Sequence, residues 1–337
     1  MSLTEQIVVF TRGDTFAGAI DPDQWHDEGM ARLPDSLNER LESVRIALAA
    51  ALRDRVIGDN AEDKQAAVML APGPRWFAPD RPIHKVHTDA SMFIGGMRAL
   101  LFQSLHPLAM AGVAQHSDYR NDPWGRLQRT ADFLAATTFG PADLAQQTID
   151  RIRTVHTRVV GTASDGRAYS ANDPHLLRWV HVAEVDSFLR AYQAYGADTL
   201  TAEEADGYVE DMAVIARALG VPAPPTSVQG LRDQLAMYRY ELKGTTESAD
   251  VAKYLLLEPP LPFTSKIPYS LISAAAIALL PVWARVELKL PYLPVAEKIV
   301  VKPIGQFVAS TIRWATAVNQ PETTEDAVTD TVETASN

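Results

Sequence analysis

The chain has 337 residues, of which 47% are hydrophobic, and this supports a substantial core in one large domain or two smaller ones. Its net charge is −11 and no run rich in lysine and arginine is present, so nucleic acid and anionic membrane surfaces are not expected as partners. The absence of cysteine excludes disulfides, thiolate metal sites, iron–sulfur clusters and cysteine nucleophiles.

The amino-terminal segment MSLTEQIVVFTRGDTF has no basic region followed by a long apolar one, so no secretory signal is visible and a cytoplasmic location is expected. The most apolar stretch, SLISAAAIALLPVWA at 270–284, is shorter than the roughly 20 residues that a membrane span requires, and Pro281 interrupts it. We therefore predict a buried core helix there and no membrane span.

Helix start and stop signals recur along the chain, whereas alternating strand patterns are scarce, so the predicted fold class is all-α. A capped helix is predicted at 35–56 and a shorter one at 62–70. The proline-rich segment 71–82 breaks the regular structure. A long helix follows from about Asp89, and Pro107 should kink or end it.

Two later helices share a start signal, an aspartate directly before a proline, and they are predicted at 123–138 and 174–195. The helix between them begins after Gly140-Pro141 and is predicted to end at Gly161, before the turn-rich segment TASDGRAYSAN. Further amphipathic helices are predicted at 201–219, 227–242, 268–290 and 303–317.

These elements predict one large helical domain over 76–317, preceded by an N-terminal helical extension at 1–75 that packs on it. The final residues are acidic, polar and nearly devoid of large apolar side chains. Such a segment cannot bury enough apolar surface to fold, so 318–337 is predicted to be a disordered tail.

The helix predicted at 123–138 carries a polar stripe. Arg126, Arg129 and Thr130 have i, i+3, i+4 spacing and share one face, which Phe133 continues. Two guanidinium groups beside an aromatic ring form a surface that can receive an anion. The spacing equally allows a solvated stripe of salt bridges.

On the helix predicted at 174–195, His181 and Glu184 lie at i, i+3 on an otherwise apolar face. A buried carboxylate must be paired, so the favoured interpretation is a salt bridge from Glu184 to an arginine of a neighbouring helix, with His181 as a hydrogen-bonded core histidine. The alternative is a non-haem metal centre that adds one or two upstream histidines, none of which has strong zinc-motif spacing: His84, His87, His106 and His116.

His156, in IDRIRTVHTRVVG, falls within a broad apolar helix face formed by Ile149, Ile152, Val155, Val159 and Val160. A neutral imidazole on an apolar face is what a haem iron takes as its proximal ligand. Arginines of a nearby helix could then pair with the haem propionates. A histidine packed in the core is the commoner explanation, and the spacing leaves both interpretations open.

Several segments in order resemble the catalytic domain of the mpaB-type and latex-clearing-protein (rubber oxygenase) family: GRLQRT, VHTRVVG, YSANDPHLLRWVH, VDSFLRAYQAYG and LLFQSLHPLAMAGVAQHSDYRNDPWG. The resemblance spans roughly residues 75–290. It implies an all-α fold with globin-like helix packing, a b-type haem held by one histidine, and oxygenase or other oxidoreductase chemistry on hydrophobic substrates. His156 takes the place of the proximal histidine, and Arg126, Arg129 and Thr130 match the family's Arg-x-x-Lys-Thr element.

Two features depart from the family pattern. Arg129 stands where the family has lysine, which keeps the positive charge but does not release its proton. The glutamate proposed as the base of rubber oxygenases has no obvious counterpart in HPLAMAGVAQHS, where His106 or His116 could serve instead. Polyisoprene is therefore not the predicted substrate.

The resulting prediction is a haem b-dependent oxygenase or oxidoreductase that uses dioxygen or peroxide on a small hydrophobic or aromatic substrate, and a homo-oligomer is compatible with it. His156 is the predicted iron ligand and His181 the second candidate. Two alternatives stay open. One is a non-haem metal oxidoreductase built in a helical bundle, and the other is a haem-binding protein without turnover.

Each remaining residue receives a predicted role. Arg126, Arg129 and Thr130 are the predicted catalytic residues, anchoring a propionate, polarising oxygen or donating a hydrogen bond on the distal side. Phe133 continues their face against the haem. Glu184 and His181 are predicted to contact His156 or an arginine without touching the iron, and so to orient that side chain.

Overall fold

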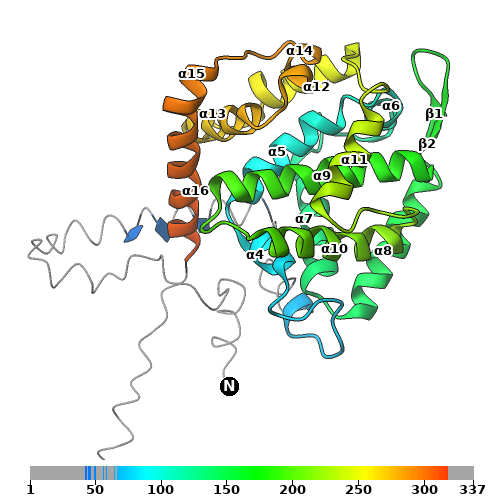
Figure 1. The fold of residues 1–337 in the computed structure, drawn as a ribbon, viewed down its shortest axis with the longest axis horizontal. Helices are drawn as coiled ribbons and strands as arrows, with labels where there is room; N and C mark the ends of the chain where they lie inside the picture. Colours follow the sequence, from blue (N-terminus) through cyan, green and yellow to red (C-terminus); the bar gives the residue numbers. More distant parts are fainter. Residues whose placement is uncertain are drawn as a thin grey trace, which may run out of the picture.

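The computed structural model describes residues 67–317, together with positions 42, 43, 45, 46, 49, 50, 56, 58 and 64. Over 67–317 the regular structure is helical apart from one short hairpin (Figure 1), and this confirms the predicted all-α class. The first helices are α4 (Pro82–Thr88), α5 (Ser91–Gln103), α6 (Pro107–His116), α7 (Pro123–Phe139), α8 (Ala142–His156) and α9 (Pro174–Tyr195). They are followed by α10 (Ala202–Leu219), α11 (Val228–Tyr238), α12 (Thr246–Leu257), α13 (Phe263–Ala278), α14 (Val282–Glu287), α15 (Pro294–Ala296), the π-helix η3 (Glu297–Val301) and α16 (Lys302–Thr316).

Helices α5 and α9 lie side by side at the centre of the molecule (Figure 1). Their close approach depends on Gly95 of α5, because a Cβ atom there would lie 2.7 Å from Cδ1 of Phe188. Buried apolar side chains of the two helices form one continuous core with side chains from Phe77 to Ala309. A shared core of this kind makes the described region a single domain.

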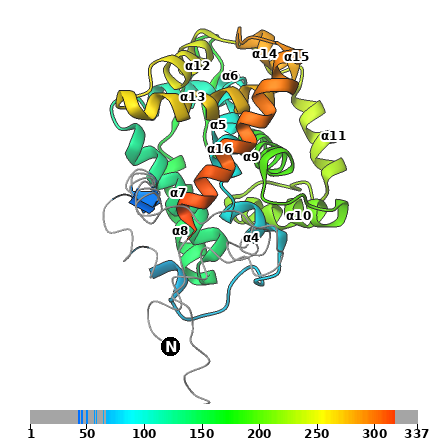
Figure 2. The ribbon, with the colours of Figure 1, turned by 90° about the vertical axis from the view of Figure 1, so that its left-hand side faces the viewer.

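The C-terminal helices close one side of this core. Helix α16 packs on α13 and α9, and Figure 2 shows it in orange-red in front of them. Arg313 of α16 donates to both carboxylate oxygens of Asp89, at 3.2 and 3.0 Å. Asp89 also accepts from the backbone N–H of Ser91 at 2.7 Å, so one carboxylate contacts the first residue of α5 and attaches α16.

The helix that carries His156 is shorter than predicted. It ends at His156 rather than Gly161, and the chain continues into β1 (Val160–Thr162), which pairs antiparallel with β2 (Ala168–Ser170). Gly161 lies against Tyr169, and a Cβ atom there would be 2.6 Å from its hydroxyl oxygen. The expected apolar helix face is therefore wrong at its C-terminal end, because Val159 and Val160 leave the helix.

Several predicted segments cannot be compared with the structure. The helix predicted at 35–56 falls mostly outside the described residues and the tail at 318–337 wholly outside them, whereas positions 64 and 67–69 of the helix predicted at 62–70 are helical. The proposed division into 1–75, 76–317 and 318–337 stays a prediction. Within the described residues, no helix combines the length and the apolar character that crossing a membrane requires.

Candidate functional site

The structure brings Arg126 and His156 to the same end of two packed helices. Helices α7 and α8 are joined by only Gly140 and Pro141 and pack against each other. Arg126 lies near the start of α7 and His156 is the last residue of α8, so both lie far from the connection.

The C-terminal end of α6 links these two helix ends. Arg126 donates through Nη1 to Oγ of Ser117 at 2.5 Å. The neighbouring residue, His116, donates through Nε2 to the carbonyl oxygen of Val160 at 3.1 Å, four residues beyond His156. The C-terminal end of α6 therefore contacts both Arg126 and the strand that follows the helix of His156.

Arg126 is a largely buried cation without a counter-ion. Among the described residues it forms no ion pair with a carboxylate, and its side chain has only the hydroxyl of Ser117 as a hydrogen-bond partner. Burial lowers the pKa of Arg126, and the positive charge of Arg129 lowers it further. A guanidinium group in this situation is stabilised by an incoming anion such as a carboxylate.

The other residues of the predicted stripe are placed differently. The side chain of Arg129 is 67% exposed and pairs with Asp122 at 3.1 Å, which is the solvated arrangement that the sequence left open. Thr130 is also exposed, and its hydroxyl donates to the backbone carbonyl of Arg126 at 3.1 Å. Phe133 is half-buried and packs against the main core.

His156 presents an unused nitrogen to the protein interior. Its Nδ1 atom is buried and has no hydrogen-bond partner, although the residue as a whole is half-buried. Burial lowers the pKa of His156, which keeps the ring neutral and leaves a lone pair available. A buried polar atom without a partner is uncommon in proteins and is a place where a ligand can supply the missing bond.

Helix α9 adds two more groups of this kind. His181 is 8% exposed, its Nε2 atom has no hydrogen-bond partner, and burial lowers its pKa to about 4. Glu184 is half-buried and surrounded by protein on most sides, and this burial raises its pKa to about 7. The predicted salt bridge of Glu184 is not formed with any described arginine. Asp186 pairs with Arg98 instead, at 2.7 Å.

A polar network beside Glu184 was not singled out from the sequence. His87 of α4 bonds through Nδ1 to the hydroxyl of Thr138 at 2.8 Å and through Nε2 to the hydroxyl of Tyr208 at 3.3 Å. Burial and, to a smaller extent, the negative charge of Glu184 raise the pKa of Tyr208, while burial lowers the pKa of His87 to about 3. Tyr208 gave no sequence signal, because a tyrosine on an amphipathic helix has the pattern of a core residue.

The predicted non-haem centre is not assembled. Among the described residues, the side chains that could jointly hold a metal ion form a single group of three, and His181 and Glu184 are outside it. That group contains His106, one of the two predicted substitutes for the family's base. His106 lies at the start of α6, whereas Ser117, which contacts Arg126, follows the end of the same helix.

These features fit a haem better than a metal ion held by side chains alone. The group needs a neutral imidazole nitrogen for its iron, and cations for its propionates. The region offers the unpartnered Nδ1 of His156 on α8 and the uncompensated guanidinium of Arg126 on α7. His84 of α4 also has a buried Nε2 atom without a hydrogen-bond partner among the described residues, but it packs on Phe139 at the other end of α7.

The sequence matches the model of the family described as ER-bound oxygenase mpaB/B'/Rubber oxygenase, catalytic domain, over residues 84–316, which is more than half of the 337-residue chain. The chain belongs to this oxygenase family. No curated protein and no solved structure matches it. The predicted globin-like packing therefore stays a prediction.

Proposed function

We propose that the protein is a haem b-dependent oxygenase that acts on a small hydrophobic or aromatic substrate. One observation carries the proposal. Among the described residues, the buried Nδ1 atom of His156 has no hydrogen-bond partner and the buried guanidinium of Arg126 forms no ion pair, and the two side chains lie on consecutive packed helices. The family supplies the oxygenase chemistry. His156 would hold the iron, and Arg126 would pair with a propionate. Arg129, Thr130 and His181 keep their predicted roles as proposals.

A bound haem supplies the site for activating dioxygen or peroxide. The protein's own contribution is to orient the imidazole, neutralise the propionates and hold a proton close to the site. Glu184 suits the last task, because a carboxyl group with a pKa of about 7 exists in both protonation states near neutral pH. Tyr208 lies close enough to Glu184 for the carboxylate charge to raise the pKa of its hydroxyl, and that hydroxyl is 3.3 Å from Nε2 of His87.

The absorption spectrum of the purified protein tests the cofactor assignment. A Soret band and visible haem bands are expected, with a shift when the reduced protein binds carbon monoxide. A colourless preparation that stays colourless after hemin is added would contradict the proposal. Haem binding without oxygen consumption on any apolar substrate would support the alternative of a haem-binding protein without turnover.

A further inference from the structure

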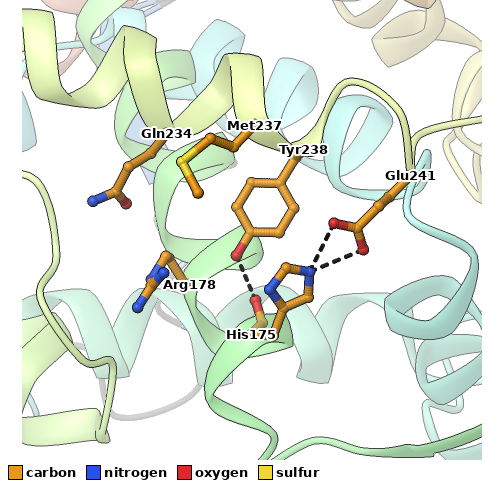
Figure 3. A pocket seen from close by; sticks show the side chains of 6 residues that line it. All are labelled: His175, Arg178, Gln234, Met237, Tyr238 and Glu241. Carbon is orange, nitrogen blue, oxygen red and sulfur yellow. Dashed lines mark hydrogen bonds and ion pairs between the residues drawn. The ribbon is translucent and has the colours of Figure 1, made fainter.

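A second cluster of potential ligands consists of His106, His175 and Glu241, none of which is assigned to the proposed haem site, and Figure 3 shows His175 and Glu241. The Nε2 atom of His175 is 2.9 Å from each carboxylate oxygen of Glu241, and Nε2 of His106 is 3.4 Å from the nearer one. His106 precedes α6, His175 is in the first turn of α9, and Glu241 follows the end of α11. One ligand atom from each residue lies within 4.8 Å of the others.

His106 is the most buried ligand of the cluster. Its side chain is 1% exposed, and its Nε2 atom faces Glu241 at 3.4 Å, which is longer than a good hydrogen bond. On the other side of the ring, Nδ1 accepts a long hydrogen bond of 3.5 Å from the backbone N–H of Ala109, which caps α6. Metal binding through Nε2 requires the ring proton on Nδ1, so it would replace this weak bond with a metal–nitrogen bond.

We propose that His106, His175 and Glu241 bind a divalent first-row transition-metal ion, with Zn²⁺ the best match. Zinc–nitrogen and zinc–oxygen bonds of about 2.1 Å place neighbouring tetrahedral ligand atoms about 3.4 Å apart. The nitrogen–oxygen separations of 2.9 and 3.4 Å are close to this spacing. Two imidazoles and one carboxylate favour ions such as Zn²⁺ over Mg²⁺ or Ca²⁺, which prefer oxygen ligands.

The space at the cluster indicates a structural role for the ion. The adjoining pocket measures about 70 Å³ and is lined by His175, Arg178, Gln234, Met237, Tyr238 and Glu241. Organic ligands occupy pockets of about 300–1,000 Å³, so this one accepts a water molecule as a further metal ligand but no substrate. The ion would join the start of α6, the start of α9 and the segment after α11.

Nearby positive charge should lower the affinity of the cluster for a metal ion. The guanidinium of Arg178 lines the pocket, and two of the ligands lie at helix N-termini, where the helix dipole disfavours a cation. We therefore expect binding that is selective for Zn²⁺ but weaker than at structural sites with four protein ligands.

Titration of the full chain, with any affinity tag removed, tests the site. One equivalent of Zn²⁺ is expected to bind in calorimetry and to raise the melting temperature, whereas Mg²⁺ has no effect. Calorimetry and the melting temperature do not rely on haem absorption, so the outcome is independent of the proposed oxygenase activity.

Substitutions at the two more exposed ligands, Glu241→Gln and His175→Gln, should each weaken Zn²⁺ binding at least about tenfold and abolish the rise in melting temperature. His116→Gln is the matched control and should bind as the parent protein does, because His116 is outside the cluster. Absence of Zn²⁺ binding by the parent protein would overturn the proposal. Equal binding by parent and both ligand variants would do the same.

Discussion

Two carboxylates of helix α9 lie two residues apart in opposite environments. Asp186 accepts hydrogen bonds from Arg98 at 2.7 Å and from Arg190 at 2.8 Å. Glu184 has no cationic partner among the described residues, and burial raises its pKa to about 7. These two carboxylates show two different roles of buried polar groups. A paired charge fixes the packing of α5 against α9, whereas an unpaired group is available to a ligand or a proton.

The largest loss of stability is expected when the buried ion pair between Arg98 and Asp186 is broken. Arg98 is 1% exposed and also donates to the hydroxyl of Ser187 and to the carbonyl of Leu279. Arg98→Ala leaves Asp186 buried without its main partner and should lower the free energy of unfolding by about 3–5 kcal/mol. Denaturant unfolding monitored by circular dichroism measures this loss.

Arg190→Ala is the control for this experiment. Arg190 pairs with the same carboxylate, but its side chain is 51% exposed, so its loss should cost less than about 1 kcal/mol. If the two substitutions have equal effects, the buried pair is not what holds the two central helices together.

For His156 we expect the opposite result, a small change in stability and a large change in cofactor binding. Because its Nδ1 atom has no partner in the protein, His156→Ala should change the free energy of unfolding by less than about 1 kcal/mol. It should nevertheless abolish stoichiometric haem retention, measured from the ratio of Soret to protein absorbance. His116→Ala serves as the control and should retain haem. Full haem occupancy of the His156 variant would refute the ligand assignment.

Glu184 should make stability depend on pH in a defined direction. Its pKa rises from 4.5 to about 7 on folding, so the folded state binds the proton more tightly than the unfolded state does. Stability therefore falls as the pH rises from about 4.5 through 7, by about 1–3 kcal/mol for this group. Denaturant unfolding at pH 5 and pH 8 measures the change.

The variant Glu184→Gln isolates this contribution, because it keeps the shape of the side chain and removes the titration. His181 acts in the opposite direction, since its pKa falls to about 4 and its contribution is lost as the pH falls below about 6.5. The quantity to compare is therefore the difference between parent and variant at each pH. A difference that does not change with pH would show that Glu184 is ionised throughout.

The starts of two helices were predictable from the sequence, because they depend only on residues adjacent in the chain. The helices expected after Asp122-Pro123 and Asp173-Pro174 begin at Pro123 and Pro174. The two aspartates cap them, accepting from the backbone nitrogens of Gly125 and His175. Capping needs only a carboxylate and the adjacent turn, so it leaves a local signal.

Features that depend on distant residues were not predictable in the same way. The predicted salt bridge was placed on Glu184, but Arg98, which is 88 residues from Asp186 in the chain, pairs with Asp186. His175 and Glu241 are 66 residues apart, and nothing in their local sequence indicates that they meet. The site residues suggested by the family resemblance could be named, but whether each is buried, paired or exposed depends on tertiary packing.

The smallest effect is expected at Arg129, where the predicted polar stripe reaches solvent. Its side chain and that of Asp122 are 67% and 50% exposed, so Arg129→Ala should lower the free energy of unfolding by less than about 1 kcal/mol. Arg126→Ala, on the same helix, removes the buried guanidinium and should weaken haem retention in hemin titrations. If Arg129→Ala weakens haem binding as much as Arg126→Ala does, then both arginines pair with propionates. Burial without a counter-ion would then not identify which arginine holds the cofactor.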